Sequence, residues 1–234
     1  NGKLEANFTY KKQWIDNSDA PTVSAFNIQY ANEGNIALGV SFQSQSAVAL
    51  TTNTAYFTFA YRIRFSELNY LKFGLSAGVL QNNLDLDEIS LTSDSDIFND
   101  PALRGVVDNT LYMSGQFGMQ LTLDRLTVGI ALPRLFNNDA NSTDDFNTPE
   151  FDQFNQFIAS ASYEARLSPI ISLQPLLLYR HVSSEQYQAE ASILTNYKNI
   201  FWVGAGYRYD ASIIGHVGLN VRDMFSFAYS YSPG

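Results

Sequence analysis

Residues 56–65, YFTFAYRIRF, alternate strictly between two kinds of side chain. One set of alternate positions is apolar and mainly aromatic: Phe57, Phe59, Tyr61, Ile63 and Phe65. The other set ends in two cations: Tyr56, Thr58, Ala60, Arg62 and Arg64. Successive side chains of a β-strand point to opposite faces, so this segment predicts a strand with one aromatic and one charged face. A soluble sandwich would turn the aromatic face to a protein core, and a membrane barrel would turn it to lipid.

The composition narrows the function classes. The chain has 234 residues, 14 tyrosines, 17 phenylalanines, only 16% charged residues and a formal net charge of −9. That balance excludes a nucleic-acid-binding face, which needs clustered cations. The absence of cysteine excludes disulfides and thiolate metal sites. No change of composition separates two parts, so residues 1–234 are predicted to form a single domain.

The same two-residue period recurs along the whole chain. In GNIALGVSFQSQ and LKFGLSAGV, apolar residues alternate with Ser, Gly, Gln and Lys. About thirteen such segments are present, many of about 9 to 12 residues, the length that a tilted strand needs to cross a bilayer. They begin near Lys3, Val23, Asn35, Thr54, Tyr70, Leu111, Arg125, Phe157, Ser172, Gln186, Ile200, Ser212 and Phe225. The longest strongly apolar run, PIISLQPLLLY, is too short for a membrane-spanning helix.

The connections between these segments also alternate. The even-to-odd connections are short and polar, as in ANEG, SELN, SPII, NYKN and RDM. The odd-to-even ones include long segments near residues 15–22, 84–109 and 137–153, although the later ones are short. Outer-membrane barrels have short periplasmic turns and longer outer loops. The pattern therefore predicts an all-β, transmembrane, antiparallel up-and-down β-barrel in the bacterial outer membrane.

The parity of the side chains predicts which residues face the lumen and which face lipid. An Arg or Lys facing lipid at mid-membrane costs roughly 2 to 4 kcal/mol, so charged positions should face inward. The predicted lumen-facing charged residues are Arg62, Arg64, Lys72, Glu164, Arg166, Arg180, Glu190 and Arg208. The predicted lipid-facing residues are Phe57, Phe59, Ile63, Phe65, Leu75, Val128, Ile130 and Phe227. The lumen charges have mixed signs, which favours ion pairs that brace the wall over the alternative, a selective pore. Tyrosines near the segment ends are expected to form interfacial girdles.

The number of predicted strands is odd. Single-chain bacterial barrels use an even number of strands, because the first and last strands must close antiparallel. Thirteen visible segments therefore predict fourteen in the complete barrel. The expectation is a barrel domain whose amino-terminal segment and last strand are not part of these 234 residues.

Catalytic and metal sites are poorly supported by the sequence. The two histidines, His181 and His216, fall on opposite parities of different segments, so neither a metal site nor a Ser/His pair is expected. The acidic stretch at residues 84–100 offers five possible calcium ligands, Asp85, Asp87, Glu88, Asp94 and Asp96, but no glycine for an EF-hand turn. This favours a solvated loop over a calcium site. No cofactor and no catalytic residue is predicted.

Several segments together resemble a known family. KKQWIDNSDAPTVSAFNIQ, NDPAL, LTVGIALPRLF, SPIISLQPLLLYRHVSS and the closing GLNVRDMFSFAYSYSPG are similar, in order and spacing, to the PorP/SprF outer-membrane proteins. The resemblance implies a non-enzymatic component of the type IX secretion and gliding machinery of Bacteroidota. It also implies partners: outer-membrane lipid, a secreted surface protein or adhesin that is exported or retained, and periplasmic secretion components.

A second function is compatible with the same architecture. A passive porin or small-molecule transporter would show the same alternating strands, because fold alone does not define function. A barrel enzyme such as a phospholipase is a more distant third alternative, since no Ser/His pair with an orienting group can be placed. The long loops around residues 87–108 and 137–153, or the periplasmic rim, are the expected binding regions of a secretion component.

Overall fold

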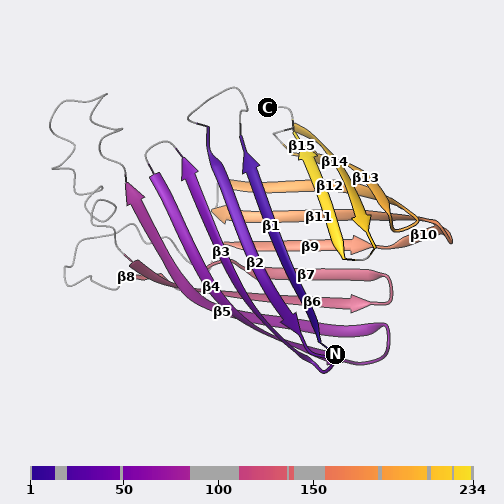
Figure 1. Ribbon diagram of the computed structural model, residues 1–234, viewed down its shortest axis with the longest axis horizontal. Coiled ribbons are helices and arrows are strands. Elements are labelled where there is room, and N and C mark those ends of the chain that lie inside the picture. The colour runs from indigo at the N-terminus through magenta and orange to yellow at the C-terminus, as the bar shows by residue number, and fades with distance from the viewer. Residues whose placement is uncertain are drawn as a thin grey trace. The chain divides into compact units, whose positions relative to one another are not determined.

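The computed structural model is built from antiparallel strands (Figure 1). It describes residues 2–13, 20–47, 50–84, 111–135, 137–139, 156–183, 186–209, 212–222 and 224–232. The first strands are β1 (Lys3–Lys12), β2 (Thr22–Ala31), β3 (Ile36–Ala47), β4 (Leu50–Arg64), β5 (Asn69–Leu84), β6 (Leu111–Leu123) and β7 (Leu126–Leu132). The later ones are β8 (Asn137–Asp139), β9 (Phe157–Tyr163), β10 (Ala165–Ser168), β11 (Ile171–Ser183), β12 (Gln186–Tyr197), β13 (Phe201–Arg208), β14 (Ser212–Val221) and β15 (Phe225–Tyr231).

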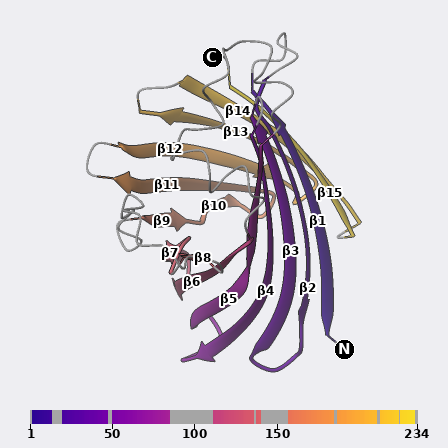
Figure 2. The same ribbon diagram turned by 90° about the vertical axis from the view of Figure 1, so that its left-hand side faces the viewer.

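The strands follow one another in a single 15-stranded sheet. Its main order is β1-β2-β3-β4-β5-β6-β7-β9-β11-β12-β13-β14-β15, with β8 paired to β6 and β10 paired to β11. The strand pairs within the described residues, from β1 with β2 to β14 with β15, are antiparallel. Figure 2 shows the long neighbouring strands β1 to β4. The predicted all-β, antiparallel, up-and-down arrangement is confirmed.

The predicted segments each correspond to a strand, with two additions. The segment FIASASYEARL, residues 157–167, was predicted as one strand, but the structure divides it into β9 and β10 at Glu164. There the Glu164 amide donates to the Arg125 carbonyl, and the register shifts between Arg166 and Ser168. The second addition, β8, lies in the predicted loop 137–153. Its sequence, NND, has no alternation of apolar and polar residues, so the two-residue period does not predict this strand.

The short connections between even and odd predicted strands are confirmed as tight turns. Asp124, Lys198, Asn199 and Arg222 have positive φ angles of 51°, 52°, 56° and 51°. Consecutive positive φ angles at Lys198 and Asn199 are typical of a type I′ hairpin turn, whose twist matches that of the flanking strands. Most of the long connections, including residues 85–110 and 140–155, lie outside the described residues.

The contacts divide the chain into two compact units. Unit 1 contains Asn1–Tyr61, Gly74–Phe117 and Arg134–Gln153, and unit 2 contains Arg62–Phe73, Gly118–Pro133 and Phe154–Gly234. Among the described residues, no helix has the length and apolar character needed to cross a membrane.

Candidate functional site

The strands of unit 1 present a continuous apolar face. The register places Tyr30, Leu38 and Phe59 side by side on β2, β3 and β4. The next row along the same face contains Ile28, Val40 and Phe57. All six side chains are exposed. Rows of large apolar side chains that no other part of the described chain covers are unusual for the surface of a soluble monomer.

Unit 2 has an apolar face of the same kind. Val128 on β7 lies across from Ala161 on β9, which pairs in turn with Leu177 on β11. Toward the last strands, Phe201, Leu219 and Phe227 form a row across β13, β14 and β15. The side chains predicted to face lipid are all exposed: Phe57, Phe59, Ile63, Phe65, Leu75, Val128, Ile130 and Phe227.

The opposite face of unit 2 carries charged groups in register. Glu190 on β12 pairs with Arg208 on β13, and Arg208 donates hydrogen bonds from Nε at 3.2 Å and Nη2 at 3.0 Å to Glu190 Oε2. Both side chains are largely shielded, with 28% of Arg208 and 16% of Glu190 exposed. The ion pair across the two strands stabilises the observed register of β12 against β13.

A second ion pair lies where β9 gives way to β10. Arg166 Nε donates to Glu164 Oε1 at 2.8 Å, and both side chains are well exposed. The pairings of Arg166 with Ser172 and of Arg180 with Gln188 place both arginines on the same face as Glu190. For Arg180, no acidic partner lies within ion-pair distance among the described residues.

The remaining predicted lumen charges lie on β4 and β5. Arg62 and Arg64 occupy the positions that alternate with Ile63 and Phe65, so they point to the face opposite those apolar residues. Lys72 lies with its ammonium group 5.0 Å from the centre of the Tyr70 ring, a cation–π contact. The structure thus brings together Glu190 with Arg208 and Glu164 with Arg166.

A hydroxyl network on the polar face of unit 1 was not predicted from the sequence. Tyr56 on β4 donates to Ser114 Oγ on β6 at 3.1 Å, and only 2% of Ser114 is exposed. Thr52 and Thr58 on β4 make further hydrogen bonds with Asn82 and Ser76 on β5. Gly78 on β5 makes the long contact possible, because a Cβ there would lie 2.6 Å from Tyr56 Cδ1. Alternation predicts the face of Tyr56 but not the strand that its hydroxyl reaches.

Aromatic rings gather at one end of the strands in unit 2. Tyr187 stacks on Tyr179 at 6.2 Å and on Tyr209 at 6.0 Å between ring centroids. Phe157 stacks with His181 at 5.4 Å at the same end of β9 and β11. Such a row matches the aromatic belt expected at a membrane–water boundary.

The two histidines lie on opposite faces, as predicted. His181 is on the apolar face of β11, whereas His216 Nδ1 is 2.7 Å from Ser230 Oγ on the polar face of β14 and β15. Within the described ranges, no group of three or more His, Cys, Asp or Glu side chains could hold a metal ion. The acidic stretch at residues 85–100 lies outside those ranges.

An antiparallel sheet with an exposed apolar face and ion pairs on the opposite face is typical of membrane proteins built from strands. The family model described as type IX secretion system membrane protein PorP/SprF matches residues 1–234, and the chain belongs to this family. It is therefore a membrane protein of the type IX secretion system, as the resemblance in the sequence predicted. No curated protein and no solved structure matches the chain significantly.

Proposed function

We propose that the sheet is part of a β-barrel in the bacterial outer membrane, with the apolar face toward lipid and the charged face toward the lumen. The exposed rows that contain Ile28, Val40 and Phe57 support this orientation, because water is a poor solvent for such a surface. The aromatic row around Tyr187 supports a boundary at one end of the strands. The complete barrel would have an even number of strands.

The proposed function is that of a non-enzymatic component of type IX secretion. The protein would support the export or surface retention of adhesin-like proteins and contact periplasmic components of the machinery. The family match over residues 1–234 carries this proposal. The loops around residues 87–108 and 137–153 are the proposed contact regions for the secreted protein; only Asn137–Asp139 of these are among the described residues.

The lumen charges are proposed to brace the wall of the barrel. The Glu190–Arg208 pair supports this role, because it connects neighbouring strands by two hydrogen bonds to one carboxylate oxygen. The mixed signs of the charges give no single-sign path for a selective pore.

The test is a deletion of the gene in the source bacterium, complemented by the wild-type protein or by a variant with loop 140–153 replaced by a Gly/Ser linker of equal length. Surface proteins are quantified by mass spectrometry after labelling of intact cells. We expect the deletion strain to lose a small set of surface proteins. These proteins should return to the surface with the wild-type protein but not with the loop variant. An unchanged set of surface proteins, together with an ohmic conductance of the purified protein in planar bilayers, would contradict it and support a porin.

A further inference from the structure

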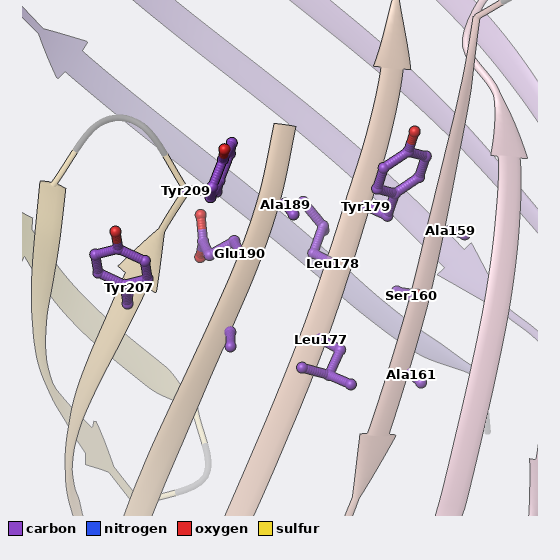
Figure 3. A pocket seen from close by; sticks show the side chains of 11 residues that line it. Ala159, Ser160, Ala161, Leu177, Leu178, Tyr179, Ala189, Glu190, Tyr207 and Tyr209 are labelled. Carbon is purple, nitrogen blue, oxygen red and sulfur yellow. The ribbon is translucent and has the colours of Figure 1, made fainter. Parts of the chain in front are cut away.

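A hollow lies on the apolar face of unit 2, over β9, β11, β12 and β13 (Figure 3). Its volume is about 440 Å³, within the range of small-molecule sites, and its lining is almost entirely apolar. Four alanines interrupt the large side chains of this face: Ala159, Ala161, Ala189 and Ala191. The hollow exists because strands that carry alanine on this face, β9 and β12, lie next to strands that carry large side chains.

The register explains the shape of the hollow. Leu177 and Tyr179 on β11 form a ridge between the alanines of β9 and those of β12. Beyond Ala189 and Ala191, Tyr207 on β13 and Tyr209, directly after β13, form the facing wall of a trough that follows β12, as Figure 3 shows. The two walls are two strand spacings apart, roughly 9.5 Å between backbones.

This width decides what can enter. An α-helix is about 10 to 12 Å across with its side chains, so it does not fit between walls at this spacing. A β-strand would pair with the edge of a sheet rather than with its face. A single hydrocarbon chain lying along β12 fits, because the walls supply apolar contacts on both sides and the alanines supply the floor. In a bilayer, additional van der Waals contacts favour one position of an acyl chain on the protein surface over another.

The two ends of the trough differ. At one end, the Tyr187 ring stacks on Tyr179 and Tyr209 and so joins the two walls through a row of phenol rings. At the other end, the next residue of β12 on the same face is Ile193, which is exposed and apolar. Tyrosine prefers the level where acyl chains meet lipid headgroups, with its ring in the apolar layer and its hydroxyl in the polar one.

We propose that this hollow is a binding site for the acyl chains of a membrane lipid, with the lipid headgroup at the level of Tyr187 and Tyr209. The proposal rests on the proposed orientation of the apolar face toward the bilayer. It goes further in assigning a preferred lipid position to one part of that face. A lipid held there would pack against β9, β11, β12 and β13 together.

The experiment uses the whole protein, reconstituted in phosphatidylethanolamine vesicles that contain a phosphatidylethanolamine with a photoreactive diazirine in one acyl chain. After irradiation, the labelled residues are located by peptide mass spectrometry. We expect the residues that line the hollow to carry about fivefold more label than Val40 and Phe57 on the apolar face of unit 1, a preference of about 1 kcal/mol. A double variant, Ala189→Leu with Ala191→Leu, fills the floor and should remove this excess.

The matched control is Ala205→Leu, because Ala205 is an exposed alanine of β13 on the same face but outside the lining. It should leave the excess label in place. Even labelling of both regions, or an equal loss in the control, would overturn the proposal. Label in vesicles but none in irradiated native membranes would also overturn it, since a protein segment would then occupy the hollow. Label on neither the hollow nor Val40 and Phe57 would instead contradict the membrane orientation itself. Circular dichroism of each variant confirms that the sheet has formed.

Discussion

Glu190 and Arg208 face each other across β12 and β13, and two guanidinium nitrogens of Arg208 donate to one carboxylate oxygen of Glu190. Glu190 borders the alanine-floored hollow, but alternation along β12 directs its side chain to the face opposite Ala189 and Ala191, so this one strand contributes to both surfaces. Because the pair is largely shielded, it is costlier to break than an exposed ion pair.

Replacing Glu190 with Gln should destabilise the protein. The substitution keeps the shape of the side chain but leaves the Arg208 charge without its anion, at an expected cost of about 1 to 3 kcal/mol. Urea titration of the protein in vesicles, followed by tryptophan fluorescence, measures the free energy of unfolding. The control is Glu164→Gln, which removes the well-exposed partner of Arg166 and should have a clearly smaller effect. Equal effects of the two variants would show that shielding does not matter here.

Adjacent residues of β2 test the orientation of the sheet. Ile28 lies on the apolar face between Ala6 and Val40, and Gln29 lies on the opposite face. Ile28→Arg should cost roughly 2 to 4 kcal/mol if the face meets the middle of the bilayer. Gln29→Arg, at the same depth, should change stability by less than about 0.5 kcal/mol. The fraction folded into vesicles over a urea series gives both values, and a reversed order would mean that the faces are inverted.

Any side chain at Gly78 on β5 is expected to destabilise the protein. A Cβ on Gly78 would overlap the backbone of Ala55 and the ring of Tyr56, so Gly78→Ala should cost on the order of 1 to 3 kcal/mol. Gly118→Ala is the control, because the nearest atom to its added Cβ is the Ile130 carbonyl oxygen at 4.0 Å. That variant should be neutral or slightly stabilising. Thermal unfolding in detergent compares the two, and a tolerated Gly78→Ala would contradict the close approach of Tyr56.

The hydrogen bond from Tyr56 to Ser114 should contribute measurably to stability. Tyr56→Phe removes the donor and leaves the buried Ser114 hydroxyl without it, at an expected cost of about 1 kcal/mol. Ser114→Ala and the double variant complete a thermodynamic cycle, whose coupling energy should be about 0.5 to 1.5 kcal/mol. A coupling energy near zero would show that the two hydroxyls do not interact in the membrane-embedded protein.

Much of the fold could be predicted because alternation is a local property. Every second residue of YFTFAYRIRF must share a face in any strand, so the face of Phe57 and that of Arg62 follow from the sequence alone. The predicted start of the fourth segment, Thr54, was late by four residues because the residues before it, LTTN, are mostly polar and give no clear period. The strand β8 was missed for the same reason.

Pairing between strands is not local, and the sequence did not predict it residue by residue. Glu190 and Arg208 were both assigned to the charged face, but only the register of β12 and β13 makes them partners. The hollow depends on the same register, because it forms where the alanines of two strands flank the ridge of a third. Likewise, Tyr56 reaches Ser114 only because Gly78 lets its ring pass.

The sequence by itself determined the long strands, the short turns between them, the two unlike faces of the sheet and the resemblance to the type IX secretion family. These properties depend on neighbouring residues and on the two-residue period of extended chain. The tertiary structure alone decided which charges pair, which glycine accommodates a tyrosine and where the apolar face is hollow. Those properties depend on hydrogen-bonded register, in which a shift of one residue would move each side chain to the other face.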